Sequence, residues 1–297
     1  MLELVRKLLS LVFAVLTALG SSFIKIDTGI PTGNPEKRNH VQYGSIFSQC
    51  YDYYLPKNLS GKKDIIFIVH GGSWTTGTDL QFKDEAIEAA KLGYIAVSMD
   101  YRKLQEGATA FDMVDDMGAA VASLKSELTS LGIKIDKMAV AGWSSGAHLA
   151  LLYSYEYYLK KSPIPVAFVC VCAPPTDFIS AARFPITLMG AAAFPLMSGL
   201  CGEIIIPGTE NLYMDKINAI SPVSLVKKGV PPTIIVYGSD DDVVPTQNGE
   251  RLYELLKEKK VDCAKVVYKG AGHFLGERYP ENTERARVFF EFADKYL

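Results

Sequence analysis

The sequence predicts an α/β fold, with a mostly parallel, doubly wound sheet covered by helices on both faces. Short, continuous apolar runs such as IIFIV at 65–69 suit strands that are buried on both sides, as in a parallel sheet. Segments with helical periodicity follow most of these runs, and alternation of strand and helix is typical of this class. The 297 residues are 48% hydrophobic and 22% charged, which is sufficient for one large α/β domain.

The expected elements follow one another from residue 48 onward. An edge strand that ends at Pro56 comes first, and we expect further strands within 65–69, 94–102, 137–142, 166–175, 231–240 and 264–273. Helical patterns lie in 82–93, 113–132, 146–159, 246–260 and 281–297. Gly93 is a good residue for ending the first of these helices. The stretch 178–221 breaks the rhythm, because it is apolar, interrupted by prolines and too irregular for one long helix.

The first 42 residues precede the expected domain, which spans 43–297. Residues 1–24 have the layout of a signal peptide: Arg6 and Lys7, an apolar run at 8–19 and a small-x-small site at 18–20. No charge occurs from Leu8 to Ile24, so an uncleaved membrane anchor is an alternative. The Gly, Pro and Asn content of 25–42 predicts a linker. We therefore expect a secreted or membrane-anchored protein, with a cytoplasmic one as the other possibility.

Charge and cysteine content narrow the classes of partner. The net charge is −2, and no basic block is present to neutralise phosphates, so nucleic acid is a poor partner. The five cysteines show no metal-ligand spacing and are odd in number, which favours free thiols over a disulfide framework. Cys170 and Cys172 should lie on one face of a strand.

A glycine-flanked serine is the first sign of chemistry. In VAGWSSGAHLALLYSY at 140–155, Gly142, Ser144 and Gly146 lie between a predicted strand and a predicted helix. A G-x-S-x-G element at a sharp strand-to-helix turn exposes the serine hydroxyl as a nucleophile. A Gly/Ser-rich turn without chemistry is the alternative, because short motifs recur by chance.

The other strand ends decide between these two interpretations. HGGSW at 70–74 follows one strand, Asp240, Asp241 and Asp242 follow another, and His273 follows the last. Ligands bind at the carboxyl ends of strands in α/β sheets. A nucleophile, an acid and a histidine therefore occur in the order Ser, Asp, His, each at a strand end, which is characteristic of one fold.

On these motifs the chain resembles the α/β-hydrolases of the carboxylesterase and acetyl-esterase-like group, including enzymes similar to hormone-sensitive lipase and kynurenine formamidase. The resemblance covers about residues 43–297. The segments that carry it are HGGSW (70–74), DYR (100–102), GWSSGAHLA (142–150), SPVSLV (221–226), GSDDDVVP (238–245) and GAGHF (270–274). Ser73 stands where many relatives have a third glycine, as in the subgroups with an HGGxW pattern.

The resemblance implies a role for each site residue. Ser144 is the nucleophile, His273 the base, and Asp241 the acid, because Gly238 and Pro245 match the family's spacing around it. Backbone N–H groups of Gly72, Ser73 and Ser145 would form the oxyanion hole. No metal or cofactor is expected.

Structural interpretations stand beside these roles. We expect His70 to make a structural hydrogen bond, His148 to face the core and His40 to face solvent. Asp240 and Asp242 are predicted to be a solvated turn rather than metal ligands. Trp74 is expected to pack beneath the oxyanion loop, and it is also a candidate substrate-binding residue. The last set is expected to pack along its helix: Tyr153, Tyr155, Tyr157 and Tyr158.

The insertion at 178–221 falls where this fold carries a cap over its active site. Apolar residues there would line an acyl or alcohol pocket, with Phe194 and Leu196 as the candidate contacts, and a mere packing extension is the alternative. The other candidates are Phe184, Leu188, Met189 and Met197. We therefore expect a serine hydrolase that cleaves small-molecule carboxylic esters through an acyl-enzyme on Ser144, with a short-to-medium acyl group or an apolar leaving group. An amidase or arylformamidase, an acyltransferase and a catalytically inactive binding protein remain as alternatives, and the oligomeric state is not predicted.

Overall fold

The computed structural model describes residues 35–181, 188–275 and 281–297. Within these ranges, eight strands form one sheet: β1 (Glu36–Gln42), β2 (Cys50–Leu55), β3 (Lys62–Val69), β4 (Ile95–Met99), β5 (Lys134–Trp143), β6 (Val166–Cys172), β7 (Thr233–Gly238) and β8 (Cys263–Tyr268). Their order across the sheet is β1-β2-β4-β3-β5-β6-β7-β8. β2 runs antiparallel to β1 and β4, and the remaining neighbours run parallel. The predicted α/β class with a mostly parallel sheet is confirmed.

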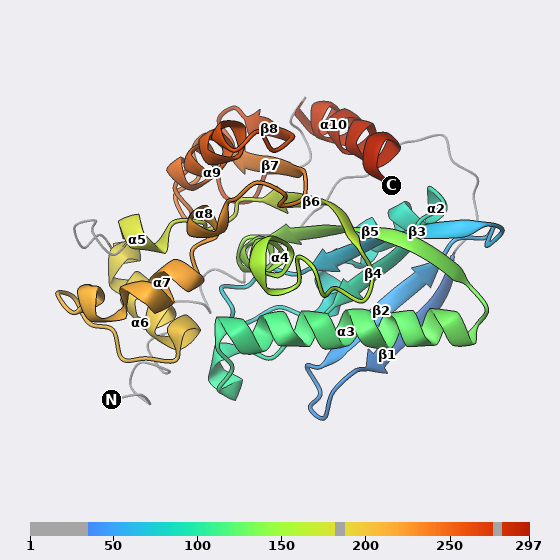
Figure 1. Cartoon of the computed structure of the whole chain (residues 1–297), viewed down its shortest axis with the longest axis horizontal. Helices are drawn as coiled ribbons and strands as arrows, with labels where there is room; N and C mark the ends of the chain where they lie inside the picture. The colour runs from blue at the N-terminus through green and yellow to red at the C-terminus, as the bar shows by residue number, and fades with distance from the viewer. Residues whose placement is uncertain (1–34, 182–187, 276–280) are drawn as a thin grey trace.

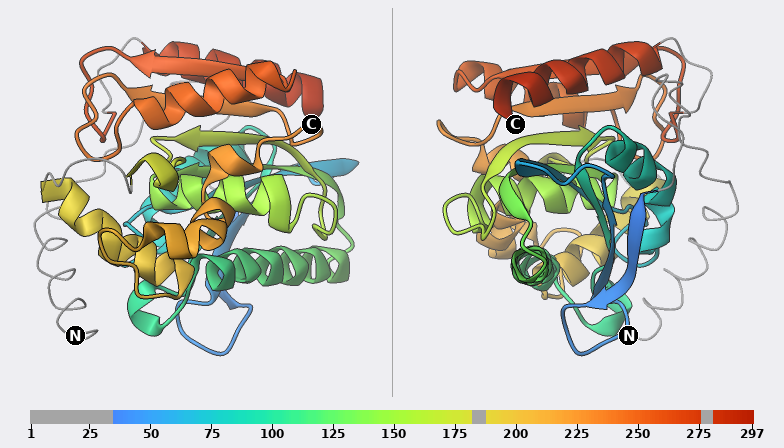
Figure 2. Two further views of the ribbon diagram at one scale, coloured as in Figure 1. Left: turned by 60° about the vertical axis from the view of Figure 1, so that its left-hand side comes forward. Right: turned by 90° about the vertical axis from the view of Figure 1, so that its right-hand side faces the viewer.

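Helices connect the strands and cover both faces of the sheet. The longer ones are α2 (Lys83–Lys91), α3 (Ala110–Ser130), α4 (Ser145–Leu152), α6 (Leu188–Cys201), α9 (Gln247–Glu258) and α10 (Glu281–Tyr296). The shorter turns are η1 (Asp79–Phe82), η2 (Leu104–Glu106), η3 (Tyr153–Tyr157), α5 (Phe178–Ala181), η4 (Glu210–Tyr213), α7 (Met214–Ala219) and α8 (Pro222–Leu225). Buried side chains of α3, α4 and α9 share one core cluster, and those of α2 and α10 share the other. The sheet therefore lies between two helical layers (Figures 1 and 2).

The apolar run of β3 shows why this strand sits in the middle of the sheet. Successive side chains of a strand point to opposite faces. Ile65, Phe67 and Val69 lie in the core beneath α3 and α4, whereas Ile66 and Ile68 lie in the core beneath α2 and α10. A strand that packs on both faces needs a continuous apolar run rather than an alternating one.

The N-terminal part of the domain differs from the sequence prediction. The linker prediction is wrong for Glu36–Gln42, which forms β1, and β2 is therefore not an edge strand. The sequence hides β1 because its side chains are mostly exposed and it joins the sheet through backbone pairing. The predicted signal peptide or anchor at 1–24 lies outside the described residues and stays a prediction. Among the helices that the structure describes, none has the length and apolarity needed to cross a membrane.

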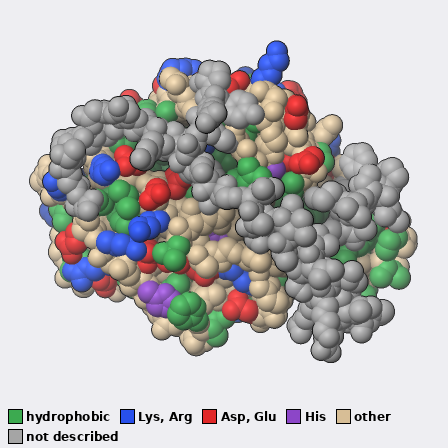
Figure 3. All heavy atoms as spheres, turned by 180° about the vertical axis from the view of Figure 1, so that it is seen from behind, with side chains coloured by type: hydrophobic (Ala, Val, Ile, Leu, Met, Phe, Trp, Pro, Cys, Tyr) green, Lys and Arg blue, Asp and Glu red, His purple; other side chains and the backbone are tan. Residues whose placement is uncertain are grey.

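The cysteines are free, as expected, and Cys170 and Cys172 both pack in the core beneath α10. On the face drawn in Figure 3, Lys and Arg side chains lie among Asp and Glu side chains, in keeping with the mixed charge of the sequence.

Candidate active site

The turn between β5 and α4 presents Ser144 at the carboxyl edge of the sheet. Ser144 has a positive φ of 52°, a conformation that non-glycine residues adopt rarely and that clusters at active sites. A Cβ on Gly142 would lie 2.5 Å from the carbonyl oxygen of Gly146, and one on Gly146 would lie 2.2 Å from that of Val69. Both flanking glycines are therefore required by close backbone approach.

Replacing Gly146 with alanine should destabilise the fold, because its Cβ would collide with the end of β3 and force backbone to move. Such overpacking destabilises proteins by about 1–3 kcal/mol. Gly272→Ala is a matched control, since a Cβ there would meet only the carbonyl oxygen of Asp240 at 3.9 Å. Urea unfolding of both variants checks this, and equal stability of the two would refute the steric explanation.

Ser144, His273 and Asp241 form a hydrogen-bonded row. The Oγ of Ser144 lies 3.1 Å from Nε2 of His273, and Nδ1 of His273 lies 2.8 Å from Oδ2 of Asp241. The three residues come from the ends of β5, β8 and β7. The loops after β7 and β8 touch, since a Cβ on Gly238 would lie 2.2 Å from the carbonyl oxygen of Ala271. The structure thus brings together residues 32 and 129 positions apart in the chain.

The acid loop distinguishes Asp241 from its two neighbours. The side chain of Asp241 is fully buried, and its Oδ1 accepts hydrogen bonds from the backbone N–H groups of Val243 and Val244 at 2.9 and 2.8 Å. Asp240 and Asp242 are exposed, and Asp240 accepts a bond from the hydroxyl of Ser239. Only Asp241 reaches the histidine, as the spacing to Gly238 and Pro245 implies.

The oxyanion loop runs directly beside the nucleophile. A Cβ on Gly71 would lie 3.4 Å from the Cβ of Ser144. Gly72, Ser73 and Trp74 have positive φ angles of 120°, 52° and 60°, and the carbonyl of Gly72 accepts the N–H groups of two residues that follow. Among the described residues, the N–H groups of Gly72 and Ser73 donate to no protein acceptor. These two donors, with the N–H of Ser145 at the start of α4, suit a developing oxyanion.

The side chain of Trp74 anchors this loop to the interior of the domain. Its indole is 4% exposed and packs against His148 and Phe178, with ring centroids 5.2 and 6.0 Å apart. The indole N–H donates to Nδ1 of His148 at 3.1 Å, and Nε2–H of His148 donates to the carbonyl of Ile220 at 2.7 Å. Burial lowers the pKa of His148 to about 4. The contacts favour the packing interpretation of Trp74 over the substrate-binding one, and they place His148 in the core as expected.

The segment after β4 also holds the oxyanion loop, a feature that the sequence did not reveal. The hydroxyl of Tyr101 donates to the carbonyl of His70 at 3.0 Å, and the N–H of Leu104 donates to the carbonyl of Trp74 at 2.9 Å. The side-chain amide of Gln105 donates to the carbonyl of Thr75. The carboxylate of Asp100 lies 3.0 Å from Nε2 of His70, so His70 is structural, as predicted.

The predicted cap contains the helix α6 and the shorter helices α5 and α7, gathered where the strands end (Figure 1). Phe194 and Met197 are buried in the main core, and Leu196 packs on that core while partly exposed. No described contact joins Phe194 or Leu196 to Ser144. Phe184 lies outside the described residues, as do the side chains of Leu188 and Met189. Two aromatic rings near the triad are those of Trp143 and Phe274, whose centroids lie 5.8 and 5.4 Å from that of His273, and sequence analysis singled out neither.

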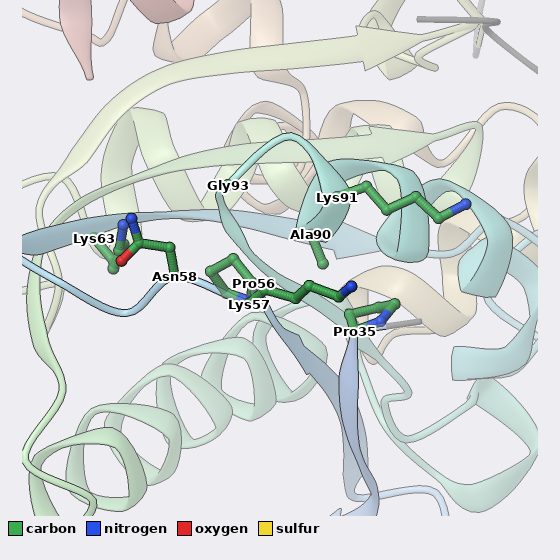
Figure 4. Close-up of a pocket in the computed structure, with 8 residues that line it drawn as sticks. All are labelled: Pro35, Pro56, Lys57, Asn58, Lys63, Ala90, Lys91 and Gly93. Carbon is green, nitrogen blue, oxygen red and sulfur yellow. The ribbon is translucent and has the colours of Figure 1, made fainter. Parts of the chain in front are cut away.

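Two other features have residues that could form a binding site. One ligand atom each of Cys50, Asp79 and Asp100 lies within 4.8 Å of the others. The buried ammonium of Lys103 is the cation bound to Asp100 there, so we do not assign these residues as metal ligands. A pocket of about 230 Å³ lies at the opposite edge of the sheet from Ser144, among residues that end β2 and α2 and begin β3 (Figure 4). It has no part in the chemistry of the triad.

Comparisons with known proteins find similarity to esterases. The BD-FAE family model matches residues 51–256. The chain is 24% identical over 246 residues to a probable isoprenylcysteine alpha-carbonyl methylesterase of Arabidopsis thaliana, covering 81% of this chain and 51% of that protein. It is 27% identical over 223 residues to the probable carboxylic ester hydrolase LipM of Mycobacterium tuberculosis, covering 71% of this chain and 48% of that protein. The chain thus spans about half the length of these curated relatives.

A solved structure shows the same fold. Esterase B from Lactobacillus rhamnosis superposes with a TM-score of 0.74 at 17% identity, over 99% of this chain and 97% of that one. The likeness supports the α/β-hydrolase architecture expected from the motifs.

Proposed function

The chain belongs to the BD-FAE family, and from this premise we propose that it is a carboxylic ester hydrolase that forms an acyl-enzyme on Ser144. The observation that carries the proposal is the row Ser144–His273–Asp241, with hydrogen bonds of 3.1 and 2.8 Å. The names of the relatives, a methylesterase and a carboxylic ester hydrolase, point to the same substrate class.

In the first half-reaction Ser144 attacks the ester carbonyl while His273 takes the hydroxyl proton at Nε2. The negative charge that develops on the carbonyl oxygen is met by the N–H groups of Gly72, Ser73 and Ser145. His273 then gives its proton to the leaving alcohol, and the acyl group stays on Ser144. The buried carboxylate of Asp241 keeps the hydrogen on Nδ1 of His273 and stabilises the imidazolium.

In the second half-reaction water takes the place of the alcohol. His273 removes a proton from the water, which attacks the acyl carbonyl, and the proton then passes to Oγ of Ser144 as the acid leaves. The same oxyanion donors serve both steps, because both pass through a tetrahedral intermediate. An acyltransferase would follow this course with an alcohol in place of water.

Acyl-chain length is the first test of the substrate class. If an apolar pocket binds the acyl group, kcat/KM on p-nitrophenyl esters should rise up to a few-fold per added carbon, because burying a methylene contributes about 0.8 kcal/mol. Leu196→Ser should flatten this dependence and spare the acetyl ester. Leu196 is the suitable position, because Phe194 is a core residue whose loss would destabilise the fold. Equal loss on all chain lengths would show that α6 does not select the acyl group.

Parallel assays separate the alternatives. Faster turnover of N-formylkynurenine than of any ester would indicate an arylformamidase. Transfer of the acyl group to an added alcohol, in preference to water, would indicate an acyltransferase. Failure of Ser144 to react with a fluorophosphonate would indicate a binding protein without catalysis.

A further inference from the structure

A buried lysine lies beneath the oxyanion loop. The side chain of Lys103 is 7% exposed, a rare environment for an ammonium unless it is paired. Its Nζ donates to Oδ1 of Asp100 and to the carbonyl of Tyr101, the latter at 2.6 Å, and lies 3.2 Å from Nε2 of His70. An ammonium has three N–H donors and no acceptor. The three acceptors around Lys103 therefore satisfy it completely.

This arrangement favours one position for the hydrogen of the His70 ring. Nε2 faces two groups with opposite requirements: the ammonium of Lys103, which can only donate, and the carboxylate of Asp100 at 3.0 Å, which can only accept. A hydrogen on Nε2 would satisfy Asp100 alone, whereas a lone pair there accepts from Lys103 and leaves the single hydrogen of a neutral ring for Nδ1. Asp100 still accepts from Lys103 and from the backbone N–H of Tyr101. A carbonyl can only accept, so Nδ1 must carry the hydrogen that bonds the carbonyl of Gly71 at 2.6 Å. Complete burial and the charge of Lys103 lower the pKa of His70, which keeps the ring neutral. His70 is then the Nδ1–H tautomer.

The hydrogen bond from His70 to the carbonyl of Gly71 fixes the orientation of the neighbouring N–H of Gly72. The peptide unit joining Gly71 and Gly72 is planar and trans, so its C=O and N–H point in opposite directions. With the C=O of Gly71 bonded to His70, the N–H of Gly72 points to the other side of the loop. That N–H is one of the free donors beside Ser144.

We propose that Lys103 is a positioning residue for the oxyanion hole. By donating to Nε2 of His70 it selects the tautomer that holds the carbonyl of Gly71, and this aims the N–H of Gly72 at the oxyanion. The inference rests on the proposed ester hydrolysis. Sequence alone gives no hint of it, because the three side chains meet only in the folded chain.

Several other groups surround His70. Asp100 lies beside Nε2, and the ring of Tyr101 stacks on the imidazole with centroids 4.3 Å apart. Behind Asp100 lie Cys50 and Asp79, and the carboxylate of Glu106 accepts the backbone N–H of Lys103 at 2.6 Å. Lys103 is thus the cation in a set of acidic groups, and its removal leaves Asp100 to draw a proton onto Nε2 of His70.

The variant Lys103→Met tests whether Lys103 acts on the oxyanion loop through the tautomer of His70, and the readout is the pH dependence of kcat. At low pH the imidazolium of His70 can bond both Asp100 and the carbonyl of Gly71. When the pH rises through the pKa of His70, the remaining proton goes to Nε2 beside Asp100, and a bare Nδ1 then repels the carbonyl of Gly71. We expect kcat to fall on the alkaline side by about tenfold or more, up to the 10²–10³ that complete loss of one oxyanion donor costs. KM should change little, and the wild type should lack the alkaline decline.

Two further variants separate an effect through the His70 tautomer from a general loss of structure. Lys103→Gln keeps an N–H donor without the charge and should restore part of the lost kcat. The double variant H70N/K103M places an amide N–H near the position of Nδ1, so it can hold the carbonyl of Gly71 without a tautomer choice. It should be more active than Lys103→Met alone at alkaline pH, which a purely structural role for Lys103 does not predict.

The tautomer can be read directly by ¹⁵N NMR of histidine-labelled protein, with H70N used to assign the signal. A neutral Nδ1–H ring in the wild type supports the proposal, and a neutral Nε2–H ring overturns it even if Lys103→Met fails to fold. Unchanged kcat and pH profile in a folded Lys103→Met would also overturn it. A wild-type protein without activity on any ester would instead refute the proposed function.

Discussion

Replacing Ser144 with alanine is expected to lower kcat on p-nitrophenyl acetate by at least about 10³-fold and to leave the fold intact. The substitution removes the hydroxyl that bonds His273 and that we propose becomes acylated, while the oxyanion donors and the histidine remain. Stability should be preserved, because the Ser144 side chain makes no capping bond to α4 and alanine tolerates the positive φ no worse than serine.

The neighbouring serine gives a matched control. Ser145 takes part in the proposed chemistry through its backbone N–H, so Ser145→Ala should retain most of the activity. Its hydroxyl lies 3.4 Å from that of Tyr101 and makes no bond to His273 among the described contacts. Steady-state kinetics and fluorophosphonate labelling of both variants measure the difference. Near wild-type turnover in Ser144→Ala, or equal losses in the two variants, would refute the assignment of the nucleophile.

The sequence predicted those parts of the molecule that local pattern determines. β3 is recognisable because it packs on both faces, so five apolar residues follow one another. The turn at Ser144 is recognisable because Gly142 and Gly146 are required by contacts only a few residues away or at the end of β3. Such constraints limit which residue types can occupy a position, so they are recognisable in the sequence without knowledge of the fold.

Other features depend on partners that are distant in the chain. β1 carries mostly exposed side chains, and what anchors it is Asp52, which bonds Lys37 and the backbone N–H of His40. Lys103 would be expected at the surface from its charge. It is buried because its ammonium pairs with Asp100 and contacts Nε2 of His70. Their pairing depends on how β3 and β4 lie together, which a single residue pattern does not encode.

Replacing Asp241 with asparagine should lower kcat by about 10³- to 10⁴-fold. The reason lies in the two backbone N–H groups of Val243 and Val244, which bond Oδ1 of Asp241 at 2.9 and 2.8 Å. These donors require an oxygen, so an asparagine would keep its carbonyl there and turn its NH₂ toward His273. Nδ1 of His273 would then have to accept, and its hydrogen would move to Nε2, which could no longer take the proton of Ser144.

Asp240→Asn and Asp242→Asn are matched controls with the same change of charge. Both carboxylates are exposed and neither contacts His273, so their loss should alter kcat only slightly. Kinetics across pH 5–9 give a second readout. Because Asp241→Asn is expected to act through the tautomer, its kcat should recover at high pH, where hydroxide can assist the attack of the serine. A larger loss in either control, or wild-type turnover in Asp241→Asn at neutral pH, would mean that another group orients His273.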